Sequence, residues 1–146
     1  VGIAEEADDL LGIKQRDCFD VDQPSIIVTI DKDLLQVPGL HYNFVKGEYN
    51  DVDEAGGQYY FYKQMLMGDA TDNIPGCRGI GDKKSDKILS PYIGNELELY
   101  RAVFECYKEQ NDKLSSDEVE KLILKSGQLV CIRQRVGEVW ELPLFN

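Results

Sequence analysis

Hydrophobic positions in the first part of the chain follow the pattern of strands. The run SIIVTI at residues 25–30 is continuous, rich in β-branched residues and too short for a buried helix. It therefore predicts a core strand of a mostly parallel sheet. Residues 41–46 are expected to form a further strand, and residues 47–53 a polar hairpin or loop.

Other parts of the chain carry apolar residues at helical spacing. Predicted helices cover residues 5–13, 58–67, 81–89, 95–111 and the segment that follows Ser115. In the first helix the residues expected on the buried side are Leu10, Leu11 and Ile13. Gly68 is expected at the C′ position after the second helix. The sequence Ser115-Ser-Asp-Glu118 is a capping box before the last helix.

The two kinds of pattern divide the chain near Asp72. An α/β region covers residues 1–72 and a mainly helical region covers residues 73–146, where residues 128–135 fit a helix or a strand equally well. A chain of 146 residues with 42% hydrophobic residues can form one domain or two small subdomains. No run of about 18 apolar residues is present, so no membrane-spanning segment is predicted.

The formal net charge of the chain is −11. Taken alone, this charge argues against nucleic-acid binding, because an acidic surface repels phosphate. The charge is unevenly distributed, however. Between residues 75 and 89 four cationic residues stand against two aspartates, a local charge of +2: Arg78, Lys83, Lys84 and Lys87 against Asp82 and Asp86. Part of the acid is clustered elsewhere, and clustered carboxylates repel one another unless cations bind them.

The histidine and cysteine content disfavours several kinds of site. The four cysteines are spread along the chain without a C-x-x-C pair, and His41 is the single histidine. A zinc site or a Ser-His-Asp mechanism is therefore not expected, and the cysteines are expected to be free thiols in a reducing cytoplasm. His41 is expected to be structural. The aromatic residues 59–62 could stack on bases, but a core position is favoured, and Trp140 is expected to pack the final segment down.

Three acidic groups are candidates for metal ligation, and all lie at predicted ends of elements: Glu6, Asp8 and Asp9; Asp31 and Asp33; Asp69 and Asp72. Each group has a structural alternative. The first could be a favourably charged first turn of a helix, Asp31 could cap a helix, and Asp69 could stabilise a turn. Asp31 and Asp33 also follow the C-terminal end of a strand, where open α/β sheets place their ligands.

Taken together, the three groups favour the binding of divalent cations. Oxygen ligands without histidine or thiolate suit Mg²⁺ or Mn²⁺. Because Mg²⁺ keeps several waters and takes few direct carboxylates, so large a set indicates two ions. Two ions can activate a water and stabilise the leaving oxygen of a phosphodiester. A structural α/β domain that binds a divalent ion for stability is an alternative.

The glycines between residues 76 and 81 precede a predicted helix that begins with lysines. Amide groups at a helix N-terminus bind phosphate, and a bound phosphate would offset the unfavourable position of Lys83 and Lys84 in the first turn. The spacing is not that of a Walker A loop. The pattern resembles a helix-hairpin-helix grip on the DNA backbone that is independent of sequence. A plain turn between two helices is the alternative.

The motifs E-A-D-D, T-I-D-K-D-L-L-Q, G-D-x-x-D-N-I-P-G and G-I-G-x-K occur in this order. In this order they resemble the flap endonuclease superfamily, and most closely the phage 5′ exonucleases and the 5′ nuclease domain of bacterial DNA polymerase I. The resemblance spans roughly residues 5–89. It implies the C-terminal part of a PIN-like, mostly parallel sheet with helices, followed by a helix-three-turn-helix DNA-binding subdomain. It also implies a cytoplasmic protein, in the host cytoplasm if the chain is phage-encoded.

The resemblance implies a 5′-3′ exonuclease or flap endonuclease that hydrolyses DNA with two Mg²⁺ or Mn²⁺ ions. By motif position the implied metal ligands are Glu6, Asp8, Asp9, Asp31, Asp33, Asp69 and Asp72. The residues implied in catalysis are Asp8, Asp9, Asp31 and Asp33. The implied DNA-binding residues lie in the glycine turn, which often holds K⁺ in this family, and on the next helix: Gly76, Arg78, Gly79, Gly81, Lys83, Lys84 and Lys87.

The chain departs from the family pattern in its first residues. The family begins with a strand that carries an early aspartate, then a second acidic residue and a basic helical arch, and none of these is present before E-A-D-D. The chain is therefore expected to be the C-terminal part of such a nuclease, completed by an N-terminal segment or a separate chain. DNA with a 5′ end or flap is the expected substrate. The alternative is a catalytically silent DNA-binding module of a replication complex.

Overall fold

The computed structural model describes residues 6–143, which form two compact units. Of these residues, unit 1 holds those up to Gly57 together with Ile132–Val139, and unit 2 holds Gln58–Cys131 and those from Trp140 onward. The boundary falls inside the helix that spans Glu54–Met67. The functional division near Asp72 stays a prediction.

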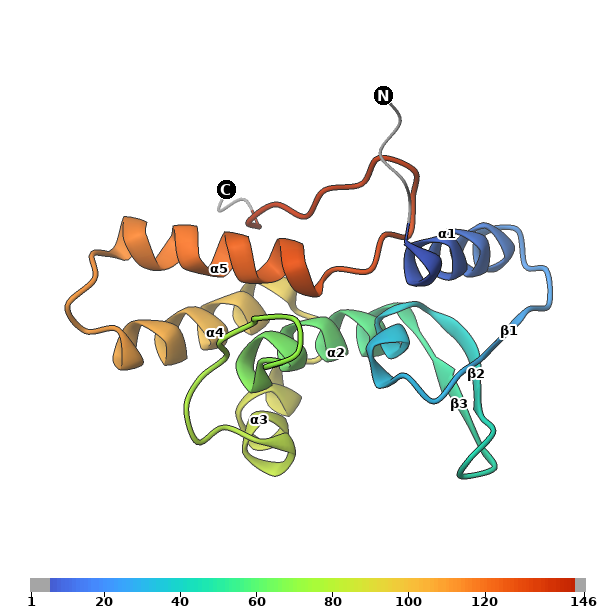
Figure 1. Ribbon diagram of the computed structural model, residues 1–146, viewed down its shortest axis with the longest axis horizontal. Coiled ribbons are helices and arrows are strands. Elements are labelled where there is room, and N and C mark those ends of the chain that lie inside the picture. Colours follow the sequence, from blue (N-terminus) through green and yellow to red (C-terminus); the bar gives the residue numbers. More distant parts are fainter. Residues whose placement is uncertain (1–5, 144–146) are drawn as a thin grey trace. The chain divides into compact units, whose positions relative to one another are not determined.

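Unit 1 contains a small mixed sheet with the strand order β1-β2-β3 (Figure 1). Its strands are β1 (Ile26–Val28), β2 (Gly39–Asn43) and β3 (Glu48–Val52). The strands predicted at residues 25–30 and 41–46 are present as β1 and β2 with shifted ends, while residues 47–53, expected as a polar hairpin or loop, form mainly the strand β3. Strand β1 pairs in parallel with β2, and β2 pairs in antiparallel with β3. The sheet of the described residues is nevertheless mixed, not mostly parallel, because a tight connection between two strands makes them antiparallel. The Asn43 side chain fixes that connection by accepting from two amides of the loop, those of Val45 and Lys46.

Only one face of β1 is buried among the described residues. Ile27 packs with Leu34, Val37 and Ile132 in the small core of this unit. The neighbouring apolar side chains of the run are 50–58% exposed: Ile26, Val28 and Ile30. The run SIIVTI therefore forms the predicted strand, but its outer face is not a core face here.

Helix α1 (Ala7–Asp20) is longer than predicted and buries a different face. Leu10 and Leu11 are 56% and 42% exposed, so their expected burial was wrong. The buried face instead includes Gly12, where a Cβ atom would lie 2.4 Å from the carbonyl oxygen of Arg133. On the same face, Gln15 donates from Nε2 to the carbonyl oxygen of Leu40 at 3.1 Å. Close backbone packing and a polar contact thus select this face instead of the leucines.

The helices from Glu54 onward follow the predicted order (Figure 1). The α-helices are α2 (Glu54–Met67), α3 (Asp82–Leu89), α4 (Glu96–Gln110) and α5 (Ser116–Val130). Two short 3₁₀ helices also occur: η1 (Lys32–Gln36) in unit 1 and η2 (Ser90–Tyr92) directly after α3. Figure 1 shows α4 and α5 as antiparallel neighbours. No helix among the described residues is both long enough and apolar enough to cross a membrane.

The helix ends in unit 2 use the signals that the sequence carries. Gly68 adopts a positive φ of 71° directly after α2, as expected for a C′ residue. The Asn95 side chain accepts from an amide in the first turn of α4. The predicted capping box is present, with Ser115 and Glu118 each accepting from the other's backbone amide.

The core of unit 2 confirms that the aromatic residues 59–62 belong mainly to the interior. Phe61 and Tyr62 are buried, and Trp140 packs on Phe61 with ring centroids 5.2 Å apart. The predicted docking of the final segment through Trp140 is thus confirmed. The buried Tyr107 hydroxyl is hydrogen-bonded inside this core, since it donates to the Met65 carbonyl oxygen at 2.6 Å.

Candidate metal and nucleic-acid binding residues

The loop after α2 is held by a short backbone bridge. The amides of Asp69 and Ile74 each donate to the other's carbonyl oxygen at 2.9 Å. Gly68 and Gly76 meet at the base of the loop, where a Cβ atom on Gly68 would lie 2.8 Å from the Gly76 nitrogen. Both glycines have positive φ. The loop therefore needs glycine at both positions for conformation and for space.

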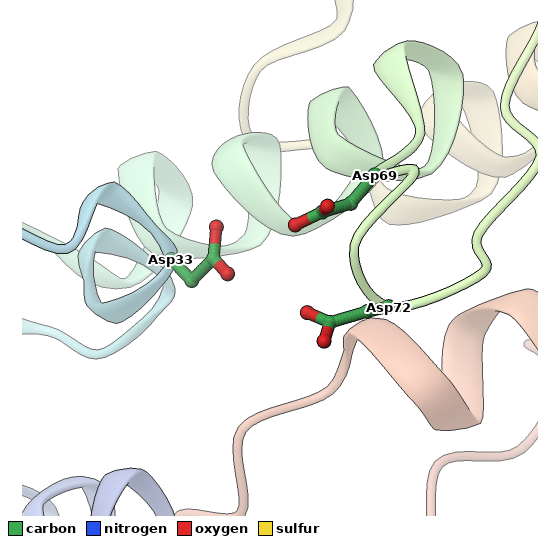
Figure 2. A group of neighbouring side chains, drawn as sticks. All are labelled: Asp33, Asp69 and Asp72. Carbon is green, nitrogen blue, oxygen red and sulfur yellow. The ribbon is translucent and has the colours of Figure 1, made fainter.

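Asp69 and Asp72 lie together on this loop. Each places a carboxylate oxygen within 4.8 Å of an oxygen of the other. Figure 2 shows both carboxylate groups directed to the same side of the loop. Asp69 also accepts from the Thr71 amide at 2.9 Å, so its predicted alternative role in a turn is observed as well. Two hard oxygen donors at this spacing can share a divalent cation.

Asp31 and Asp33 lie around the start of η1, directly after β1. Asp31 is the N-cap of η1 and accepts from the Asp33 amide at 2.9 Å, which is the capping alternative. Asp31 is exposed and Asp33 is half-buried. Figure 2 draws Asp33 on η1, which belongs to unit 1. Both side chains thus follow the C-terminal end of a strand, as expected.

Glu6, Asp8 and Asp9 stand at the N-terminus of α1. Asp8 and Asp9 lie in the first turn, where negative charge is favourable to the helix dipole. Asp9 accepts from the Arg133 amide at 2.8 Å, which ties α1 to the returning segment of unit 1. Glu6 is exposed and makes no side-chain cap. The structural alternative is therefore observed for this group too.

The turn that leads into α3 has an open backbone. Gly79 has a positive φ of 77°, and a Cβ atom at Gly79 or Gly81 would meet no atom within 4 Å. Gly81 is the N-cap of α3, and no side chain caps the helix there. Room and uncapped amides are the local requirements for binding an anion at a helix start.

The charged residues of α3 lie on separate faces. Asp82 and Asp86 are four residues apart and both contact α2: Asp82 Oδ1 lies 2.8 Å from Lys63 Nζ, and Asp86 accepts from the Tyr59 hydroxyl. Ser85 and Leu89 form the buried stripe. The lysines take the remaining face and form no ion pair with a described residue: Lys83, Lys84 and Lys87.

Three residues in contact with this region were missed by the sequence analysis. Besides Lys63 and Tyr59, Gln110 clamps the turn: Arg78 donates its amide to Gln110 Oε1 at 2.6 Å, and Gln110 Nε2 donates to the Arg78 carbonyl at 2.9 Å. Tyr59 lies 27 residues from Asp86 in the sequence, and Gln110 lies 32 residues from Arg78. No local pattern in the sequence signals them.

The Cys77 thiol inside this turn is not poised for chemistry. Burial raises the pKa of Cys77 to about 12, with nearby Cys106 acting in the same direction. The thiol therefore stays protonated near neutral pH. A protonated buried thiol is a poor nucleophile and a poor metal ligand, so the turn offers backbone groups and not sulfur.

Comparison with known proteins agrees with the resemblance in the motifs. The chain is 34% identical to DNA polymerase I of Deinococcus radiodurans over 149 residues, covering 95% of the chain and 15% of that polymerase. It is 29% identical to flap endonuclease Xni of Pseudoalteromonas translucida over 144 residues, covering 92% of the chain and 52% of that protein. The 5′-3′ exonuclease of Halalkalibacterium halodurans is 28% identical over 154 residues, with coverage of 86% and 48%. No protein-family model matches the chain.

The described elements define an α/β protein, with a three-stranded mixed sheet and five α-helices. The similarities over most of its length identify the kind of α/β protein: the chain belongs to the 5′-3′ nuclease superfamily. It spans 12% to 17% of the DNA polymerase I relatives at the head of the comparison and about half of the two smaller nucleases.

Proposed function

We propose that the protein to which this chain belongs is a divalent-metal-dependent 5′-3′ exonuclease or flap endonuclease that hydrolyses DNA. The observation that carries the proposal is the pair Asp69 and Asp72, with carboxylate oxygens within 4.8 Å, which lies ten and seven residues before the open glycine turn at Gly79. The names of the relatives support it, since they include a flap endonuclease and 5′-3′ exonucleases.

In this proposal the metal ligands are the carboxylates of the three motif groups: Glu6, Asp8, Asp9, Asp31, Asp33, Asp69 and Asp72. The donor set fits Mg²⁺ or Mn²⁺, since it consists of carboxylates alone. Two bound ions would supply an activated water and neutralise charge on the scissile phosphate. The hydrogen bond from the Thr71 amide orients Asp69, and the bond from the Asp33 amide orients Asp31.

The glycine turn and α3 would hold the duplex, in the manner of a helix-three-turn-helix. The supporting observations are the open backbone at Gly79 and Gly81, the uncapped start of α3, and the exposed lysines opposite its buried stripe. The predicted contacts are Gly76, Arg78, Gly79, Gly81, Lys83, Lys84 and Lys87. A K⁺ ion at the turn is part of the same proposal, because carbonyl oxygens in such a turn are ligands for it.

An N-terminal segment or a separate chain would cover the apolar surface of unit 1. The exposed side chains of β1 and α1 support this: Leu10, Leu11, Ile26, Val28 and Ile30 are each at least 42% exposed. Large apolar side chains that stay exposed are candidates for an interaction site when they gather into a patch. The relatives of nuclease size are about twice as long as the chain.

The test uses the whole protein with Mn²⁺ and a duplex that carries a 5′ flap. Asp33→Asn and Asp69→Asn should each lower the cleavage rate by at least about 100-fold, since they remove ligand charge. DNA binding should change little in both variants. Asp112→Asn, an exposed loop substitution far along the sequence, is the matched control and should cleave normally. If the whole protein neither binds Mn²⁺ nor cleaves the flap, the proposed enzyme activity is wrong.

A second function, a catalytically silent DNA-binding module, is favoured by one observation. The glycine turn, α3 and their supports all belong to unit 2, so DNA binding needs no carboxylate of unit 1. Such a module would bind the same duplex with and without divalent ions. It would leave the DNA uncut with every metal tested.

A further inference from the structure

Both aspartates of α3 contact side chains of α2, one through an ion pair and one through a hydrogen bond. Lys63 is a lysine with only 8% of its surface exposed, and its Nζ lies 2.8 Å from Asp82 Oδ1. One turn earlier on α2, the Tyr59 hydroxyl donates to Asp86. Lys63 Nζ also lies 5.8 Å from the centre of the Tyr59 ring, so the two residues act at one place.

Burial of Lys63 has a cost that the ion pair offsets. A lysine is rarely this buried unless it is paired, because removal of its ammonium group from water is unfavourable. The stem of Lys63 packs within unit 2 while its ammonium reaches the first turn of α3. The ion pair places a positive charge at the N-terminal end of α3, the end that is proposed to face phosphate.

Without Lys63, the start of α3 would present a poor surface to an anion. Asp82 is the first residue of the helix, beside the uncapped amides that follow Gly81. Its carboxylate favours the helix dipole, but it would repel a phosphate group placed at the same amides. The helix itself carries three lysines against two aspartates. The ammonium group of Lys63, 2.8 Å from an Asp82 side chain that is 79% exposed, offsets part of this repulsion.

We propose that Lys63, assisted by Tyr59, is a positioning residue for DNA binding: it neutralises Asp82 and turns the aspartates of α3 toward α2, so that Lys83, Lys84 and Lys87 face the phosphates unopposed. This inference rests on the proposed DNA grip. It adds to that grip a residue outside the motifs, and it explains how two aspartates are tolerated in a phosphate-binding helix of an acidic protein.

The experiment measures the affinity of the whole protein for a 5′-flap duplex over a range of salt concentrations. Lys63→Met should weaken binding about five- to tenfold at low salt, since an uncompensated carboxylate then stands near the phosphate. The slope of log Kd against log salt should change little, because Lys63 contacts no phosphate in this proposal and the lysines of α3 are retained. Lys63→Arg, which keeps the charge, should bind within about twofold of the wild type.

The deciding variant is the double substitution Lys63→Met with Asp82→Asn. If Lys63 acts by neutralising Asp82, removal of both charges should restore the affinity lost in Lys63→Met. A lysine that only supports the fold would not be rescued in this way. Lys121→Met, an exposed site on α5, lowers the net charge equally and should leave binding unchanged.

Two outcomes overturn the inference and are distinct. If the wild type binds the duplex while the double variant stays as weak as Lys63→Met, the inference fails and the DNA grip stands. If the wild type does not bind the duplex, the proposed grip fails and the inference fails with it. Circular dichroism of each variant checks that α2 and α3 are still formed.

Discussion

At the scale of the residue, His41 shows how burial fixes a protonation state. It is 3% exposed, and its Nε2 lies 2.7 Å from the carbonyl oxygen of Val37, so Nε2 must carry the proton and donate. Its Nδ1 has no hydrogen-bond partner among the described residues. A second proton on Nδ1 would thus be buried without an acceptor. The pKa of His41 is lowered from its ordinary value, mainly by burial and against the effect of the Val37 bond.

The lowered pKa of His41 predicts a loss of stability in mild acid. The unfolded chain takes up a proton near pH 6.5, whereas the folded chain does so only at lower pH. The contribution of His41 is therefore fully present above about pH 6.5 and is lost as the pH falls below it, by at most about 1.4 kcal/mol per pH unit. Thermal unfolding of the wild type and of His41→Gln at pH values from about 5 to about 7.5 tests this, because that range brackets the titration of histidine in the unfolded chain.

In the His41→Gln variant the mild-acid slope should be smaller than in the wild type. Carboxylates titrate equally in both proteins, so the difference between the two curves isolates the histidine. Parallel curves over the whole pH range would contradict the predicted role of His41. The sequence indicated a structural histidine, but its tautomer depends on which carbonyl it meets, and only the fold decides that.

At the scale of the element, the loop between α2 and α3 needs glycine for two different reasons: a positive φ at some positions and a lack of space for a Cβ atom at others. Gly68 and Gly79 both have positive φ, but only Gly68 is also in close contact, with the Ile74 carbonyl oxygen 2.7 Å from a would-be Cβ. Gly81 has neither a positive φ nor a close neighbour. The motif G-D-x-x-D-N-I-P-G thus needs its first glycine for two physical reasons.

Alanine substitutions at these glycines should form a graded series. Gly68→Ala should lower the free energy of unfolding by about 2–4 kcal/mol, from strain plus collision with backbone atoms. Gly79→Ala should cost about 1–2 kcal/mol, the price of a left-handed alanine alone. Gly81→Ala should be within about 0.5 kcal/mol of the wild type. Denaturant unfolding of the three variants measures the order, and an equal effect at Gly68 and Gly81 would contradict it.

Elements with their own local signals were predicted well, and their buried faces less well. The caps at Gly68 and Ser115 and the start of α3 at Gly81 agree with the structure, because each depends on neighbours in sequence. The face of α1 was wrong, because the partner of that helix is the segment around Arg133, far along the chain. A helix with leucines on one side can still bury another side when close backbone packing is offered there.

At the scale of the whole molecule, the net charge of −11 hides a local basic surface. The lysines of α3 are exposed and form no ion pair with a described residue, while Asp82 and Asp86 face α2. A substrate phosphate responds to the nearest charges, since more distant ones are screened beyond roughly 8–10 Å at physiological salt. The acidic total therefore does not exclude DNA as a partner.

Reversal of the basic surface should remove DNA binding without removing the metal site. In the whole protein, Lys83→Glu with Lys84→Glu should weaken duplex binding by at least about 100-fold at low salt, because two attractive charges become repulsive. Calorimetry should find Mn²⁺ affinity unchanged if the two sites are separate. The matched control, Lys121→Glu with Lys125→Glu on α5, changes the net charge equally and should retain binding. Equal loss in both pairs would indicate a response to total charge only.

The sequence by itself determined the elements, the three carboxylate groups and the glycine–lysine turn, because these depend on residues close together along the chain. The four motifs, taken in order, were also enough to indicate the family. The tertiary structure alone decided that Lys63 pairs with Asp82. It also decided that one face of β1 stays exposed. These features arise from contacts between distant segments, whose cost in chain entropy is offset only when the whole unit packs.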